Sequence, residues 1–107
     1  MNYYARLENT KAYIEDRIGR DELFAQLAEE AAELAHTALK MRRVITGDNP
    51  TPIKKHEASA ALIEEIADVM LLIEMVDVCG DSEVEAIKNE KIMRWRERLE
   101  KKIYDIS

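Results

Sequence analysis

The 107 residues carry a formal net charge of −6 and are 47% hydrophobic, which fits one domain and excludes two independent cores. Only three Gly and two Pro interrupt the chain, as is typical of long helices, and the acidic balance argues against binding of nucleic acid polymers. We expect a cytoplasmic protein with no membrane partner, because the chain lacks a long apolar stretch and a signal-peptide pattern, and its single cysteine excludes an internal disulfide.

Helical periodicity predicts four helices, which the Gly and Pro residues separate. The first helix covers about residues 3–18 and stops at Gly19, and the second begins near Asp21 as its N-cap. Residues 46–55 hold both prolines and predict an exposed loop, in which Thr51, directly before a proline, is the expected N-cap of the next helix.

The third helix is predicted over about residues 56–78, with Gly80 as its left-handed terminus. Ser82 and Glu85 form a capping-box pattern, which places the start of the fourth helix at Ser82. No stretch shows the alternation of a strand. The sequence therefore predicts an all-α fold, a four-helix bundle that forms a single domain over residues 1–107.

Apolar residues recur along each predicted helix at steps of three and four, and these seams predict the core. The seam of the fourth helix includes Trp95, for which we favour a core position over stacking against a nucleotide base. The seams consist of Tyr4, Leu7, Ile14 and Ile18; Leu27, Ala31, Leu34, Ala38, Met41 and Ile45; Leu62, Ile66, Val69, Ile73 and Val76; and Val84, Ile92, Trp95, Leu99 and Ile103. The third helix is apolar on more than one side, which predicts completion of the bundle by self-association, as a dimer or a dimer of dimers.

Two of these helices carry matched pairs of carboxylates beside their seams. Glu30 and Glu33 each stand one position before a seam residue of the second helix. Glu65 and Asp68 do the same on the third. Side chains three residues apart on a helix have Cβ atoms about 5–6 Å apart, so each pair can reach one cation. If the two helices pack together, four carboxylates converge, and an all-oxygen ligand set suits Mg²⁺ or Mn²⁺.

Two other interpretations of these acids make different demands on the sequence. A single such pair is usually a solvated helix face, but two pairs beside the core repel each other and call for a positive partner. A ferritin-like di-iron site needs two Glu-x-x-His elements, and only Glu33 with His36 forms one, because Ile53 stands three positions before His56. We therefore expect His36 to be a half-exposed surface or rim residue and His56 to lie in the loop or the first helical turn.

The fourth helix supplies the opposite charge. Lys91, Arg94 and Arg98 each stand one position before a seam residue and form a basic stripe. Alone, such a stripe is equally typical of a solvated helix face. Beside a metal site it predicts binding of a di- or triphosphate, since metal ions and basic side chains together neutralise phosphate oxygens. Lys40, seven residues after Glu33, is a further candidate for this role.

The motifs Glu29-Glu30-x-x-Glu33 and Glu65-x-x-Asp68, with the basic stripe that follows, resemble the MazG-like family of all-α nucleoside triphosphate pyrophosphohydrolases. The resemblance covers about residues 21–100. It implies the fold of that family and hydrolysis between the α and β phosphates, with a nucleoside monophosphate and pyrophosphate as products. The resemblance also implies a role for this hydrolysis in removing unwanted nucleotides from the nucleotide pool.

By the same resemblance, the magnesium ligands are Glu30, Glu33, Glu65 and Asp68, and Glu29 supports a ligand or orients the attacking water. The 31 residues between Glu33 and Glu65 are long for the motif, so the preference for base and sugar does not transfer. The main alternative is a non-catalytic helical module that binds a partner or a nucleotide and whose acidic faces are merely solvated.

Overall fold

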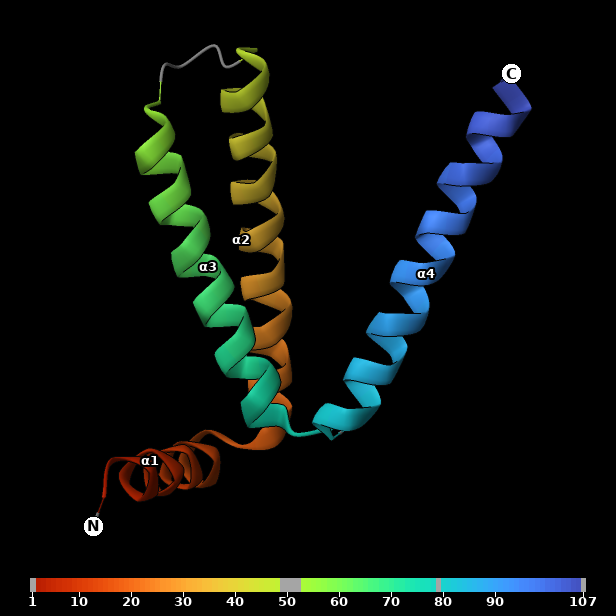
Figure 1. The fold of residues 1–107 in the computed structure, drawn as a ribbon. Helices are drawn as coiled ribbons and strands as arrows, with labels where there is room; N and C mark the ends of the chain where they lie inside the picture. Colours follow the sequence, from red (N-terminus) through yellow and green to blue (C-terminus); the bar gives the residue numbers. More distant parts are fainter. Residues whose placement is uncertain (1, 49–52, 79, 107) are drawn as a thin grey trace. The chain divides into compact units, whose positions relative to one another are not determined.

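The computed structural model describes residues 2–48, 53–78 and 80–106 (Figure 1). Within these ranges the chain forms four helices and no strand, which confirms the all-α prediction. None of these helices combines the length and the low charge that a membrane span requires. The helices are α1 (Tyr3–Ile18), α2 (Arg20–Thr46), α3 (Lys55–Val76) and α4 (Asp81–Ile106).

The ends of the first two helices follow from local chemistry. The side chain of Asn2 caps α1 by accepting a hydrogen bond from the Ala5 N–H at 2.9 Å. Gly19, with φ of 93°, separates α1 from α2, and Gly47 ends α2 in the left-handed conformation that glycine adopts without strain. Asp21 is not the predicted N-cap, because α2 already begins at Arg20 and Asp21 lies in its first turn.

Two other predicted helix ends are also wrong. The helix α3 ends at Val76, two residues early, so the positive φ falls on Asp77 (42°) and not on Gly80. Aspartate tolerates this conformation better than most residues do. The helix α4 begins at Asp81, one residue before Ser82, so the capping box is not formed. The expected N-cap at Thr51 lies outside the described residues.

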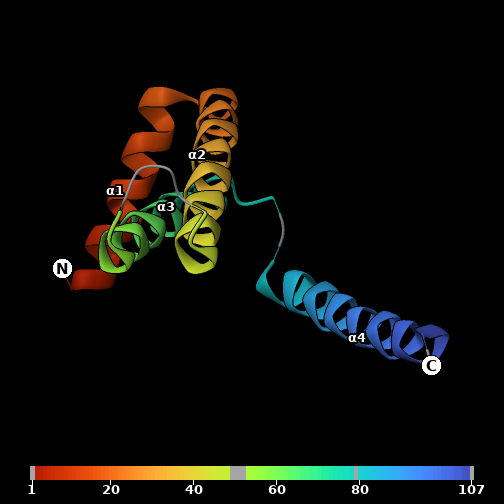
Figure 2. The same cartoon turned by 90° about the horizontal axis from the view of Figure 1, so that it is seen from above.

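The chain divides into two compact units, residues 1–76 and residues 77–107, and each is described by itself. In the first unit, α2 and α3 lie side by side and α1 packs against them near the start of α2 (Figures 1 and 2). The prediction of one domain over the whole chain stays a prediction.

The core of the first unit lies where three helices meet. Leu23 at the start of α2 is only 1% exposed and packs with three residues at the end of α3, Leu72, Met75 and Val76. Ile14 of α1 is packed against this cluster. The Arg20 guanidinium donates a hydrogen bond to the Val76 carbonyl at 2.8 Å and so ties the start of α2 to the end of α3.

Away from this cluster the predicted seams are buried only in part. Leu34, Met41, Leu62 and Val69 are half-buried, whereas Ile45, Ile66 and Ile73 are exposed. Two helices alone cannot enclose a side chain on all sides. Full burial of large side chains is therefore confined to the end of the pair that α1 covers.

The second unit consists of α4 and the residues that lead to it. All of its described side chains are exposed, and Trp95 is 63% exposed, so the unit by itself does not provide the core position predicted for Trp95. Ion pairs one turn apart support the helix: Lys88 with Glu85 at 2.9 Å and Arg96 with Glu100 at 2.7 Å. Exposed pairs of this kind contribute about 0.3–0.5 kcal/mol each.

Candidate metal centre

Three of the predicted ligands converge between α2 and α3. Glu30 of α2 and Glu65 and Asp68 of α3 each offer a carboxylate oxygen, and these three oxygens lie within 4.8 Å of one another. Glu65 and Asp68 share one face of α3 because they are three residues apart, and the packing of α2 on α3 brings Glu30 to that face. All three side chains are half-buried. We call these residues the acidic cluster.

The acidic cluster is electrostatically strained without a cation. The pKa of Glu65 is raised above its ordinary value of 4.5, first by a hydrogen bond with Glu30, which requires a proton on one of the two groups, and then by desolvation. The charges of Glu30, Asp68 and Glu33 raise it further. The oxygen Oε2 of Glu65 is buried and has no hydrogen-bond partner among the described residues.

These features fit a hard divalent cation. Such a cation would relieve the repulsion that raises the Glu65 pKa and would give Oε2 a partner. The donor set is entirely carboxylate oxygen, which suits Mg²⁺ or Mn²⁺ and offers nothing to soft metals. Half-burial keeps part of the acidic cluster accessible from solvent.

The remaining predicted acids, Glu33 and Glu29, are not part of the acidic cluster. Glu33 is exposed and is not part of the group of converging oxygens, although its charge acts on Glu65. Glu29 is exposed as well, and it stands about 100° around α2 from Glu30 because neighbouring helix residues are rotated by that angle.

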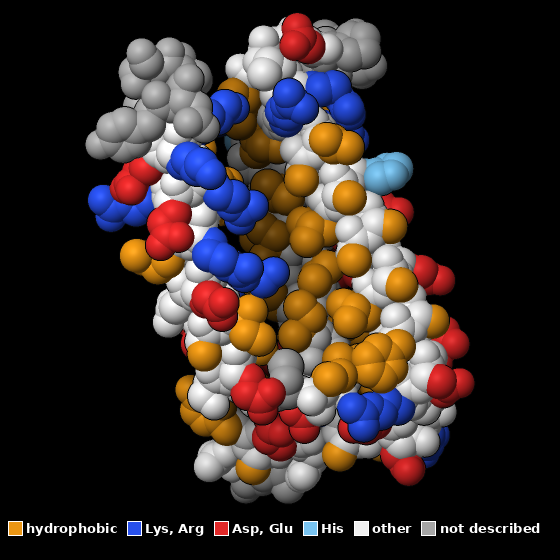
Figure 3. Space-filling model, turned by 90° about the vertical axis from the view of Figure 1, so that its right-hand side faces the viewer, with side chains coloured by type: hydrophobic (Ala, Val, Ile, Leu, Met, Phe, Trp, Pro, Cys, Tyr) orange, Lys and Arg blue, Asp and Glu red, His pale blue; other side chains and the backbone are white. Residues whose placement is uncertain are grey.

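The predicted basic residues are exposed. Lys40 lies on α2, ten residues after Glu30, whereas Lys91, Arg94 and Arg98 lie on α4 in the second unit. Figure 3 shows Lys and Arg side chains gathered along α4. Arg94 lies 4.0 Å from Glu90, and the Arg98 Nε donates to the Arg94 carbonyl at 3.4 Å. Such long contacts leave both guanidinium groups available to an anion.

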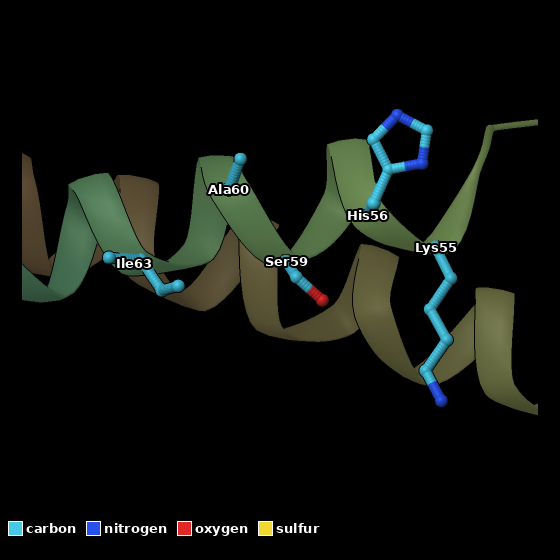
Figure 4. Close-up of a pocket in the computed structure, with 5 residues that line it drawn as sticks. All are labelled: Lys55, His56, Ser59, Ala60 and Ile63. Atoms are coloured by element: carbon cyan, nitrogen blue, oxygen red, sulfur yellow. The ribbon is translucent and has the colours of Figure 1, made fainter.

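Neither histidine belongs to the acidic cluster. His36 is exposed on α2, and His56 lies in the first turn of α3, as predicted. His56 borders a shallow depression with Lys55 and Ser59 (Figure 4). In that view His56 extends to one side of α3 while Lys55 and Ser59 extend to the other, so no common binding point is formed.

The sequence interpretation missed a cleft beside the acidic cluster. Among the described residues that line it, Gln26 is the one uncharged polar side chain; it precedes Glu30 by four residues and therefore lies one turn away on the same face of α2. That spacing was the available signal. Spacing alone does not reveal a cleft, because the cleft depends on how α1 packs on the helix pair.

Comparison of the chain with family models, with curated proteins and with solved structures found no match. The functional conclusion therefore depends on the residues of the site itself.

The raised pKa of Glu65 predicts a pH-dependent gain in stability for Glu65→Gln without metal. Because the folded state holds this proton more tightly than the unfolded chain, ionisation of Glu65 opposes folding. This loss of folding free energy is absent below a pH of about 4.5. It develops as the pH rises through the pKa of Glu65 in the folded state and is fully present above that pKa. In EDTA, the melting temperature of Glu65→Gln should exceed that of the wild type by a few degrees near neutral pH.

The exposed neighbour Glu64 provides the control, since Glu64→Gln removes the same charge outside the acidic cluster. Thermal melts followed by circular dichroism at several pH values measure both variants. An equal shift for the two, or a Glu65→Gln gain that does not shrink in acid, would contradict strain in the acidic cluster.

Proposed function

We propose that this protein is a metal-dependent nucleoside triphosphate pyrophosphohydrolase. The convergence of Glu30, Glu65 and Asp68 is the observation that supports the proposal most directly. A solvated helix face has no need to place three half-buried carboxylates together, whereas a site for a cation does. The sequence resemblance supplies the reaction: water adds across the anhydride between the α and β phosphates, and the monophosphate and pyrophosphate leave.

In the proposed reaction the acidic cluster holds Mg²⁺ or, as a substitute, Mn²⁺. The bound ion supplies charge neutralisation on the phosphates and lowers the pKa of a coordinated water. Glu33, whose charge acts on Glu65, is the proposed fourth ligand. Glu29 is proposed to support a ligand or to accept a hydrogen bond from the attacking water.

The proposed phosphate-binding residues are basic and exposed. Lys91, Arg94 and Arg98 form a stripe on one face of α4, and Lys40 lies two turns beyond Glu33 on α2. An Arg or Lys beside a metal-bound polyphosphate neutralises the charge that the ion leaves uncompensated. We also propose that all four helices form a MazG-like bundle and that self-association completes it.

A product assay tests the function. With Mg²⁺ or Mn²⁺ present, one or more ribo- or deoxyribonucleoside triphosphates should be converted to the monophosphate with release of pyrophosphate, and EDTA should stop the reaction. Chromatography of the nucleotides and a pyrophosphate assay measure both products. Release of orthophosphate with a stable diphosphate would contradict cleavage between α and β. Inactivity over a broad nucleotide panel would favour the non-catalytic helical module.

A further inference from the structure

Basic side chains gather at one end of the first unit. Over residues 40–56 the chain carries five Lys or Arg and a single acid, Asp48, although its net charge is −6. Figure 3 shows Lys and Arg side chains gathered at this end of the helix pair, near the top of the view. Four of these bases lie where α2 ends and α3 begins, and we call them the basic end: Arg42, Arg43, Lys54 and Lys55.

The charge of the basic end is not neutralised within the first unit. All four side chains are exposed, and none of them forms an ion pair with a described residue. Elsewhere Lys11, Lys88 and Arg96 each contact a Glu carboxylate. Unpaired bases produce a positive potential that reaches about 8 Å into physiological saline. Because acids outnumber bases in the rest of the chain, an anionic surface is attracted to this end of the molecule and repelled elsewhere.

The basic end is separate from the acidic cluster. Lys55 precedes Glu65 by ten residues on α3, which places the two residues about 15 Å apart along the helix axis. This separation exceeds the screening length at physiological salt, so a partner at the basic end does not compete for the proposed metal site. The proposed function therefore leaves the four bases without a role.

An exposed aliphatic side chain lies among these bases. Ile45, in the last turn of α2, is 68% exposed and stands three residues after Arg42. A lipid surface matches this combination, since its headgroups attract basic side chains and its acyl boundary accepts an aliphatic one. A single-stranded nucleic acid matches it less well, because residues 40–56 contain no aromatic side chain on which a base could stack.

We propose that the basic end binds the surface of an anionic phospholipid membrane. Clusters of about four to eight Lys or Arg are typical of segments that bind such surfaces, and the contact is reversible and sensitive to salt. The proposal revises the expectation of no membrane partner. That expectation was drawn from the lack of a spanning stretch, and binding at a surface requires none.

Sedimentation with lipid vesicles tests this inference on the whole protein. In about 50 mM salt, vesicles with about 40% phosphatidylserine should bind at least about 5-fold more protein than vesicles of phosphatidylcholine alone. Raising the salt to about 0.5 M should abolish the difference, because ions then screen the attraction between the bases and the headgroups.

Matched double variants locate the contact. Arg42→Gln/Lys55→Gln should lower binding to phosphatidylserine vesicles about 10-fold or more. Arg6→Gln/Arg17→Gln removes the same charge at exposed positions of α1, which packs at the other end of the helix pair, and should bind as the wild type does. Ile45→Asn should also weaken binding although it leaves the charge unchanged. Circular dichroism checks the fold of each variant.

Each outcome decides the proposal. Equal sedimentation with the two kinds of vesicle, or equal loss of binding in the two double variants, would overturn it. A gel shift with RNA, without any preference for phosphatidylserine vesicles, would assign the basic end to nucleic acid and overturn the lipid proposal. Unchanged binding of Ile45→Asn would overturn the contact of Ile45 with the acyl boundary. The experiment contains neither nucleotide nor metal, so the proposed function is tested separately.

Discussion

Glu30→Gln, Glu65→Gln and Asp68→Asn are each expected to lower kcat for pyrophosphate release by roughly 100-fold or more. Loss of a residue that merely supports a metal ligand typically costs about 10–100-fold, and a ligand itself should cost at least as much. Each substitution keeps the shape of the side chain and removes the charge that holds the cation. Steady-state kinetics over a range of Mg²⁺ concentrations measures the effect, and circular dichroism checks the fold.

Glu64→Gln is the matched control, since this neighbour of Glu65 is exposed and takes no part in the acidic cluster. It should retain near-normal kcat at the same Mg²⁺ concentration. Glu33→Gln is also expected to lose most activity, as the fourth proposed ligand. A variant with near-normal turnover would remove its residue from the ligand set, and near-normal turnover in all of them would end the proposal of a catalytic metal.

The acidic cluster was within reach of sequence reasoning because it depends on helical phase. Glu30 and Glu65 each stand one position before a seam residue of their own helix, so both stand at the same angle to their seams. Packing of α2 on α3 then brings them together with Asp68. Phase does not fix how far each helix is rotated about its own axis. That rotation decides which carboxylates converge, and in the structure Glu33 is exposed and stands outside the converging group.

The core and the cleft were harder to predict because both depend on α1. The seams predict which side of α2 faces α3, but Leu23, the most buried large side chain among the described residues, is not a predicted seam residue. It is buried because α1 crosses the pair at that level and Ile14 packs against the cluster. The same crossing encloses Gln26. No periodicity within one helix reveals where another helix crosses it.

One face of α3 exposes a continuous apolar stripe. Its members are exposed by 40–66% and follow one another at steps of three and four: Ile63, Ile66, Met70 and Ile73. At 3.6 residues per turn this stripe lies on nearly the opposite side of α3 from Leu72 and Met75, so the core of the first unit cannot cover it. Burial of a side chain of this kind contributes about 1.5–3 kcal/mol, which gives the stripe a strong tendency to associate.

We expect the protein to self-associate, as a dimer or a dimer of dimers, through this stripe on α3. Met70→Lys places a charge in its middle and should shift the protein to a monomer of 12.4 kDa, because an unpaired charge is costly to bury. Ala28→Lys adds the same charge at an exposed position of α2, outside the stripe, and should leave the oligomer intact. Light scattering at micromolar concentration measures the mass of each. A wild-type chain that is monomeric and active would refute self-association. A symmetric dimer through this stripe would bury the new charge twice, once from each subunit. An oligomeric Met70→Lys would therefore place the interface on another face.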